Sequence, residues 1–466
     1  MSNRVRMGLG ILLFTLRVAA ATAEEPAPRT LLIALDAVPF WVVDEVTDPQ
    51  LGLQAAFQGF QGPVQLVSTF PSSTSVAMVG ILHPLGLEKS PGYEARFFDW
   101  QRLKTRGGGM ISYSKIEFPW RDFFDWNRRD PVGSAVEAVR PVKSGTKRLR
   151  KAIDAFVASE ADVTLIYIAA TDIAVHVVGP DSVKQLLVDL DKMLQDARAK
   201  RPERPFETVI FSDHGVAGGE PLINVSKATK KALKAAGYQT RKKLAKPGTV
   251  VMTPFGLVSN FEAYTYPELK LDVAAVLAGV AGVDLCVVAT GESSWQVLAA
   301  NGSATFALDT SGAQPRWHYA SEGEDPLGYG ALIARLGPTA VDPDGWVEDG
   351  DLFESTWDQP FPDALHRMAD AFELVTNPAS VVCSTGSGYM YGAPSTSALA
   401  RVGGKGKLRW THGALSRAAA TGFLLSDVAG WQPPEALRYD RALLPFAQLL
   451  SRHPHVSLPA APPPGE

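Results

Sequence analysis

Nearly unbroken apolar runs recur in the first half of the chain, and stretches with helical periodicity separate them. The runs cover residues 31–35, 64–68, 163–168 and 208–211. Such runs are typical of strands that are covered on both faces, as in a parallel sheet flanked by helices. Apolar residues recur at helical spacing in residues 147–159 and 182–199. The pattern predicts an α/β fold, a three-layer α/β/α arrangement with a mostly parallel central sheet.

The second half of the chain is less regular, with many Gly, Pro and Trp residues and several short strand-like pieces. Residues 227–236 form a basic helical run, which we interpret as a solvated face. We expect an inserted cap at residues 218–404 and catalytic-core segments on either side of it, residues 24–217 and 405–457. A Pro-rich, disordered tail is expected at residues 458–466.

The start of the chain differs from the rest. Arg4 and Arg6 precede a short apolar stretch, and an Ala-Thr-Ala sequence ends at Ala23. This pattern predicts a secretory signal peptide, residues 1–23, and an exported protein, periplasmic or secreted. The alternative is an uncleaved N-terminal anchor, although the apolar stretch is far shorter than the roughly 20 residues that span a bilayer. No later segment has the length and hydrophobicity of a membrane span.

Composition excludes some classes of function. The 466 residues are 46% hydrophobic and 20% charged, as in an ordinary globular protein. Forty-five Lys and Arg against 49 Asp and Glu leave a net charge of −4, so no nucleic-acid-binding surface is indicated. Cys286 and Cys383 lack the paired spacing of a zinc knuckle. Both lie in strand-like runs, where a disulfide and two buried thiols are equally compatible with the sequence.

Aspartate and histidine side chains follow three of the predicted strands and recur near the end of the chain. They are Asp36, Asp172, His176, Asp213, His214 and His412. Taken singly, such an aspartate often caps a helix and such a histidine is often a satisfied core residue. In open α/β sheets, however, ligands bind at the carboxyl ends of strands, where the fold would gather these groups. Three carboxylates and three imidazoles suit zinc or a similar divalent ion.

A group of hydroxyl residues at 68–75 surrounds Pro71, which suits the first turn of a helix. A hydroxyl at that position can simply cap the helix. A helix N-terminus also presents free backbone amides and a positive dipole end, which stabilise an attacked phosphoryl group. A nucleophilic hydroxyl in this segment is therefore a second interpretation.

Five motifs, in this order, resemble the alkaline phosphatase superfamily, and most closely its type I phosphodiesterase and nucleotide pyrophosphatase branch. They are Asp36 after the first strand, Thr69-Phe70-Pro71 ahead of a helix, residues 167–180 as Y-x4-D-x3-H-x2-G-P, Ser-Asp-His-Gly at residues 212–215 and Thr-His-Gly at residues 411–413. The resemblance implies an alkaline phosphatase-like fold with an inserted cap region.

The resemblance also implies two metal sites, usually occupied by zinc. Asp172, His176 and His412 would hold one ion. Asp36, Asp213 and His214 would hold the other, with the oxygen of Thr69 bound to it. Thr69 directly precedes Phe-Pro, as the family's nucleophile does, and is therefore the predicted nucleophile. Thr74 is the alternative, although a helix residue there would more often face its own backbone.

The activity implied is a phosphodiesterase that acts on a small phosphate ester through a phosphothreonine intermediate. A phosphomonoesterase of the same superfamily and a catalytically silent metal-containing binding protein are the alternatives. The asparagine that helps to clamp substrate in the phosphodiesterase branch is missing from residues 89–96. Arg96 is the candidate substrate contact in its place, unless it forms an ion pair with Glu94 or Asp99. The sequence leaves the oligomeric state open.

Overall fold

The computed structural model describes residues 28–51, 55–107, 118–127, 140–254, 256–393 and 408–458. The predicted signal peptide lies outside the described residues, and so does the predicted tail except for Leu458. Within these ranges, every helix is too short or too polar to cross a bilayer.

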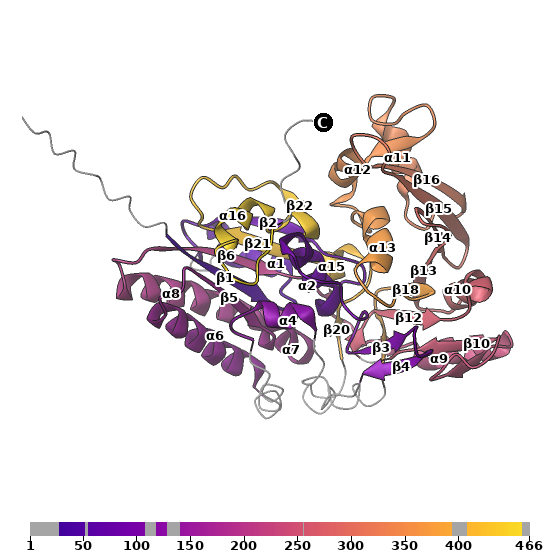
Figure 1. Ribbon diagram of the computed structural model, residues 1–466, viewed down its shortest axis with the longest axis horizontal. Coiled ribbons are helices and arrows are strands. Elements are labelled where there is room, and N and C mark those ends of the chain that lie inside the picture. The colour runs from indigo at the N-terminus through magenta and orange to yellow at the C-terminus, as the bar shows by residue number, and fades with distance from the viewer. Residues whose placement is uncertain are drawn as a thin grey trace, which may run out of the picture.

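A six-stranded sheet forms the centre of the first structural unit (Figure 1). Its order is β22 (Ala436–Arg438), β2 (Gln61–Val67), β21 (Thr421–Ser426), β6 (Phe206–Ser212), β1 (Arg29–Leu35) and β5 (Val163–Ile168). Strand β1 pairs in parallel with β5 and β6, and β22 pairs in parallel with β2. Only β21 runs against its neighbours. The four predicted strands and the mostly parallel sheet are confirmed, whereas β21 and β22 were not predicted.

Helices cover both faces of this sheet. Leu31, Ile33 and Leu35 pack on the side of α1 (Phe40–Thr47), α6 (Pro141–Ala158), α7 (Ala170–Val177) and α8 (Lys184–Lys200). The alternate residues Leu32 and Ala34 pack on the side of α2 (Thr74–Leu82) and α4 (Pro119–Phe123). Because side chains alternate along a strand, β1 contributes to both apolar layers. The predicted three-layer α/β/α class is confirmed.

A second sheet of nine strands lies beside the first (Figure 1). In spatial order its strands are β17 (Trp346–Glu348), β16 (Arg316–Gly323), β15 (Gly302–Asp309), β14 (Ser294–Leu298), β13 (Val283–Ala289), β18 (Val381–Thr385), β12 (Asn260–Tyr264), β10 (Thr249–Met252) and β9 (Gln239–Arg241). All nine fall within the predicted cap, whose exact limits stay a prediction.

Helices also flank the nine-stranded sheet. On one face, α9 (Ser226–Ala235) and α10 (Lys270–Ala278) pack against β10, β13 and β18. On the other, α11 (Tyr329–Leu336), α12 (Asp349–Thr356) and α13 (Ala364–Glu373) share an apolar cluster with the central sheet. The two sheets are therefore joined by a continuous core.

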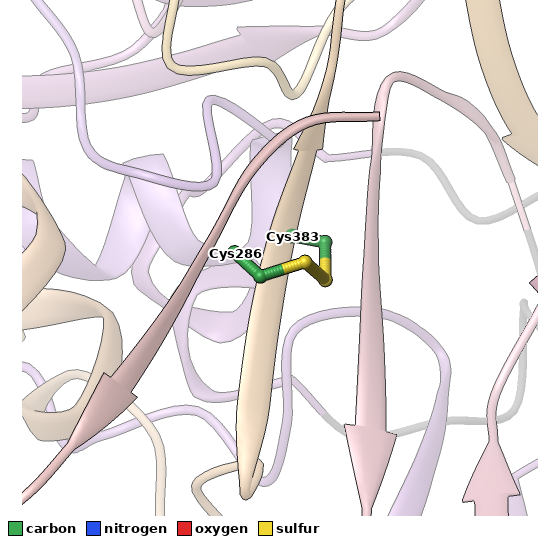
Figure 2. Close-up of a disulfide and its surroundings, with 2 residues drawn as sticks. All are labelled: Cys286 and Cys383. Atoms are coloured by element: carbon green, nitrogen blue, oxygen red, sulfur yellow. A yellow bond between two sulfur atoms is a disulfide. The ribbon is translucent and has the colours of Figure 1, made fainter. Parts of the chain in front are cut away.

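Cys286 on β13 and Cys383 on β18 stand directly opposite each other and form a disulfide (Figure 2). Both side chains are fully buried. The pairing that the sequence left open is a bond between neighbouring strands of the second sheet.

Short elements complete the chain. Strands β3 (Arg96–Asp99) and β4 (Lys104–Gly107) form a hairpin. Strand β20 (Trp410–Thr411) pairs antiparallel with the distant β7 (Ala217–Gly218). A three-stranded sheet has the order β11 (Leu257–Val258), β19 (Tyr389–Gly392) and β8 (Ile223–Asn224). The remaining helices are α15 (Arg417–Ala420), α16 (Ala447–Leu450) and the 3-10 turns Pro49–Leu51, His83–Leu85, Pro180–Val183, Pro267–Leu269, Tyr439–Arg441 and Leu444–Phe446.

Candidate metal centre and active site

Asp172, His176 and His412 form one cluster of possible metal ligands, with one ligand atom from each lying within 4.8 Å of the others. Asp172 and His176 are one helical turn apart on α7, directly after β5, so they share a face of the helix. Oδ1 of Asp172 lies 3.1 Å from Nε2 of His176 and 3.4 Å from Nε2 of His412. The structure therefore brings together the three residues predicted for the first site.

His412 reaches this cluster because β20 pairs with β7. Thr411 is opposite Ala217, three residues after His214, so the pairing carries His412 to the end of β6. Its carbonyl accepts hydrogen bonds from the backbone N–H and the hydroxyl of Ser259, at 2.6 and 2.8 Å. The rings of His412 and His214 stack with centroids 4.2 Å apart. A two-residue strand thus completes the cluster.

Asp36, Asp213 and His214 form the second cluster, also within 4.8 Å. Leu35 and Ser212 are paired in the parallel register of β1 and β6, so the next residues, Asp36 and Asp213, leave the sheet side by side. Nε2 of His214 lies 3.7 Å from Oδ1 of Asp36 and 3.4 Å from Oδ2 of Asp213. All three side chains are buried.

The three imidazoles share one hydrogen-bonding arrangement. In each ring Nδ1 faces a backbone carbonyl: His176 faces Trp410 at 2.9 Å, His214 faces Gly215 at 3.0 Å, and His412 faces Ser72 at 3.1 Å. A carbonyl only accepts hydrogen bonds, so each Nδ1 carries the proton and each Nε2 offers its lone pair to the clusters. This is the tautomer and the backbone support that histidine ligands of metals have.

The charges of the second cluster are poorly compensated by the protein itself. Burial, with the charges of Asp213 and Asp172, raises the pKa of Asp36 well above its usual range. Burial raises the pKa of Asp213 to about 8. Burial and the neighbouring His412 lower the pKa of His214 well below its ordinary value. Oδ2 of Asp213 accepts no hydrogen bond from the described residues. A bound cation would balance these carboxylates, and the mixed carboxylate and imidazole set fits zinc.

The first cluster is better balanced. Burial favours the neutral form of Asp172, but the imidazoles of His176 and His412 outweigh it and hold the pKa of Asp172 well below its usual range. The negative charge of Asp172 correspondingly raises the pKa of His176 against the effect of burial. Asp172 is also partly exposed, with 23% of its side chain accessible to solvent, whereas the side chain of His176 is nearly buried.

Thr74 is the hydroxyl residue at the second cluster. Its Oγ1 donates to Oδ1 of Asp36 at 3.1 Å and lies 3.4 Å from Nε2 of His214. The hydroxyl of Tyr167 donates to the other oxygen of Asp36. Thr74 is partly exposed and is the first residue of α2, whose first N–H groups have no partner within the helix.

Thr69, the predicted nucleophile and metal ligand, does not reach either cluster. Its side chain is fully buried, and Oγ1 donates to the carbonyl of Pro71 at 2.8 Å. Its methyl group packs where a side chain on Gly80 would stand. The prediction assumed a helix beginning at Pro71, but α2 begins at Thr74. The hydroxyl at the helix N-terminus is therefore that of Thr74, whereas the hydroxyl of Thr69 lies against the carbonyl of Pro71.

Arg367, on α13, supports both loops of the centre and was not singled out in the sequence. Its guanidinium is fully buried and donates to the carbonyls of Thr69 at 3.1 Å and Leu415 at 2.8 Å. It also donates to Oγ of Ser72 at 3.1 Å. These contacts join the segment that leads into Thr74 to the segment that follows His412. Arg367 lies in the irregular half of the chain, where no motif marks it.

Two further carboxyl groups lie near the first cluster. Burial, with the charges of Glu262 and Asp172, raises the pKa of Glu94 to about 8. Burial raises the pKa of Glu262 to about 7, and its oxygens accept from Nδ2 of Asn260 at 2.7 Å and from Oγ1 of Thr253 at 3.3 Å. Glu94 is partly exposed and Glu262 is buried. From the sequence, Glu94 is predicted only as a partner of Arg96, and no local pattern marks Glu262.

Arg96 begins β3 and makes none of the ion pairs considered for it. Asp99 pairs with Arg102 instead, at 2.8 Å. Nη1 of Arg96 donates to the carbonyl of Pro254 at 3.4 Å, and its Nε is buried without a hydrogen-bond partner among the described residues. Nothing in the described structure joins Arg96 to the six ligand residues.

Comparison with known proteins adds an independent finding. The family model of type I phosphodiesterase/nucleotide pyrophosphatase matches residues 97–331, half of the chain. Human ectonucleotide pyrophosphatase/phosphodiesterase 5 has 14% sequence identity and a TM-score of 0.47, covering 94% of this chain and 97% of that one. An inactive variant of the murine protein in complex with AMP has 13% identity and a TM-score of 0.46, with the same coverage.

Phosphonoacetate hydrolase from Sinorhizobium meliloti 1021, in complex with phosphonoformate, has 12% identity and a TM-score of 0.48, covering 92% of this chain and 96% of that one. No curated protein matches the chain in sequence. The segment that the family model matches contains Asp172, His176, Asp213 and His214. The chain therefore belongs to the type I phosphodiesterase/nucleotide pyrophosphatase family and is a phosphoric ester hydrolase.

Proposed function

We propose that the chain is a two-metal phosphodiesterase that works through a phosphothreonine formed on Thr74. The observation that carries this proposal is the position of the Thr74 hydroxyl, 3.1 Å from Asp36 and 3.4 Å from His214 at the N-terminus of α2. In this position one hydroxyl is next to both a set of metal-type ligands and a helix end that favours anions.

Asp172, His176 and His412 would hold one divalent ion, and Asp36, Asp213 and His214 the other. The uncompensated carboxylates and the three Nε2 atoms support this assignment, and zinc suits the donors. Bound ions of this kind would supply Lewis-acid chemistry, which activates a hydroxyl and neutralises the charge that develops on a phosphoryl group.

The chain's own residues have three tasks in this proposal. Thr74 attacks phosphorus, so that its Oγ1–P bond forms while the ester bond to the leaving alcohol breaks. The alcohol departs with a proton. Water then cleaves the phosphothreonine, which releases the phosphate monoester and restores the hydroxyl. The first backbone N–H groups of α2 stabilise the phosphoryl oxygens, and Asp36 orients Thr74 through their hydrogen bond.

Two alternatives remain in view. A phosphomonoesterase would use the same residues, since only the room for a second ester group separates the two activities. A metal-containing binding protein would retain the ions without turnover. The positioned hydroxyl of Thr74 favours an enzyme. Arg96 is left out of the proposed substrate site because it contacts Pro254 instead of the metal centre.

We also propose that the chain is exported and that residues 1–23 are its signal peptide. The charged and then apolar start of the sequence supports this, and so does the disulfide between Cys286 and Cys383. Structural disulfides belong mainly to oxidising compartments outside the cytosol.

A matched pair of variants tests the proposed nucleophile. Thr74→Val and Thr69→Val each remove one hydroxyl and nearly preserve the shape of the side chain. We expect Thr74→Val to lower kcat for bis-p-nitrophenyl phosphate by about 10³-fold or more, because the attacking atom is lost. Thr69→Val should stay within about tenfold of the wild type, since only a local hydrogen bond is lost.

Zinc content and covalent labelling complete the test. Both variants should retain the wild-type zinc stoichiometry, and acid-quenched wild-type enzyme should carry a p-nitrophenyl phosphoryl group on Thr74. A label on Thr69, or equal losses in the two variants, would reject the assignment. A metal-loaded wild type that turns over neither this diester nor p-nitrophenyl phosphate would favour the binding protein, and faster turnover of the monoester would favour a phosphomonoesterase.

A further inference from the structure

A strongly basic segment follows Asp213 and His214 in the sequence. Between Glu220 and Glu262 the chain has eight Lys and Arg residues and no Asp or Glu, although the whole chain has a net charge of −4. The eight are Lys227, Lys230, Lys231, Lys234, Arg241, Lys242, Lys243 and Lys246. This segment is therefore strongly basic, unlike the chain as a whole.

Part of this segment surrounds a hollow of about 380 Å³. Its lining is Arg241, Lys242, Lys243, Ala245, Lys246 and Thr249. The hollow lies where β9, the edge strand of the nine-stranded sheet, leads through a loop into β10. Four cationic side chains and no carboxylate line it. Within the described parts of the chain, none of the four makes an ion pair.

The backbone of the hollow is held firmly, although its side chains are exposed. The N–H of Thr105 donates to the carbonyl of Lys242, and the N–H of Leu244 donates to the carbonyl of Leu103, both at 3.0 Å. The side chain of Leu244 is buried. The β3–β4 hairpin thus anchors the basic loop, and the cations project from a fixed base. Preorganised cations lose less entropy when an anion binds.

The lysines of α9 have a different setting. Lys227, Lys230, Lys231 and Lys234 follow the i, i+3, i+4, i+7 spacing of one helix face, and all are exposed. They form the solvated face that the sequence predicts, and they are not among the residues that line the hollow. Their charge adds to the positive potential of this region without creating a contact surface of its own.

We propose that the hollow lined by Arg241, Lys242, Lys243 and Lys246 is a binding site for a compact anion that carries several phosphate groups. Four neighbouring cations repel one another, and a single multivalent anion relieves that repulsion at all four. In a hollow, a compact anion can contact several of the four cations at once. A flat bilayer surface would contact only the cations at the rim of the hollow. None of the lining residues belongs to the metal centre, so this site does not depend on the proposed function.

Calorimetric titration of the metal-loaded protein with inorganic tripolyphosphate tests the site. The test variant is Lys242→Glu/Lys243→Glu, and the matched control is Lys230→Glu/Lys231→Glu, which makes the same change of net charge on α9. We expect the dissociation constant to rise by about tenfold or more in the test variant and by less than about threefold in the control. Any binding of the probe at the metal centre is common to all three proteins. Turnover of bis-p-nitrophenyl phosphate without the anion should be equal in all of them.

Salt and membrane measurements decide between the remaining outcomes. Raising the ionic strength should weaken the wild-type interaction, because the contacts are exposed ion pairs. Equal losses of affinity for tripolyphosphate in the two double variants would overturn the proposal, because the anion would then respond only to a diffuse positive potential. No binding of tripolyphosphate would overturn it as well. Binding to phosphatidylglycerol vesicles without binding to tripolyphosphate would assign this face to a membrane surface instead.

Discussion

The carboxyl group of Glu262 is buried, and its hydrogen-bond donors are uncharged. Asn260 donates a hydrogen bond to one of its carboxyl oxygens and Thr253 donates to the other, and only 4% of the residue is exposed. These partners offset only part of the desolvation, so burial raises the pKa of Glu262 from its ordinary 4.5 to about 7. The folded protein therefore retains a proton on Glu262 at pH values where the unfolded chain has released it.

This difference makes stability depend on pH with a defined sign. Between about pH 4.5 and pH 7 the folded state binds more protons than the unfolded state, so the free energy of unfolding falls as the pH rises. The contribution of Glu262 is at most about 3 kcal/mol. We expect Glu262→Gln to flatten the pH dependence of the urea midpoint across this window. Glu268→Gln changes an exposed carboxyl group and should keep the same pH dependence of the urea midpoint as the wild type. If the urea midpoints of Glu262→Gln and the wild type change in parallel with pH, the raised pKa of Glu262 is contradicted.

At the scale of elements, helix α13 connects the second sheet to the active-site loops. Arg367 extends from this helix to the carbonyls of Thr69 and Leu415 and to the hydroxyl of Ser72. Ser72 in turn donates to the carbonyl of Ala414 at 3.0 Å, and its own carbonyl faces Nδ1 of His412. The loop before α2 and the loop after β20 are therefore joined both by the guanidinium of Arg367 and by the hydrogen bonds of Ser72.

Substituting Arg367 should affect catalysis more than the binding of substrate. We expect Arg367→Met to lower both kcat and the affinity for zinc, because the loops that hold Thr74 and His412 lose their shared support. The unpaired carbonyls should also lower the free energy of unfolding by about 3 kcal/mol. Arg367→Lys, which retains one charged donor, should recover part of both effects.

Steady-state kinetics and competition with a zinc chelator measure these changes. Arg335→Met, at an exposed position on α11, is the control and should leave both quantities unchanged. If Arg367→Met lowers only the free energy of unfolding, with wild-type kcat and zinc affinity, the arginine has a structural role alone.

The elements differ in how far the sequence reveals them. Long apolar runs and helical periodicity predict β1, β5, β6, α6 and α8, because their burial leaves a local pattern. Strand β20 has two residues, and its partner β7 lies almost 200 positions earlier, so no local pattern marks it. The start of α2 was missed because Pro71 suits a helix start, although the chain continues for three more residues before the helix begins at Thr74. The six candidate ligand residues were thus recognisable in the sequence, whereas the choice between the two threonines depends on where that helix begins.

At the scale of the whole molecule, the two ligand clusters draw on four separate segments of the chain. Asp36, the pair on α7, the pair after β6, and His412 are all brought to one end of the central sheet. Ions bound there would link these segments in the folded state only. Metal binding and global stability should therefore be coupled.

Removal of the ions tests this coupling. We expect treatment with a chelator to lower the melting temperature, by an amount equivalent to about 3 kcal/mol for each ion when free zinc is at a hundred times its dissociation constant. Addition of zinc should restore it. His412→Ala should reduce the bound zinc from two ions per chain to one and should show a smaller shift. An unchanged melting temperature after complete removal of zinc would contradict the proposed centre.

The pairing of β20 with β7 has a consequence for how the protein is made. Translation delivers Asp36, Asp172 and Asp213 before His412, which follows Asp213 by almost 200 residues. A nascent chain can pair β1, β5 and β6 and still lack the third residue of the first cluster. Hydrolytic activity should consequently be absent until the segment that carries His412 has been synthesised and has paired with β7.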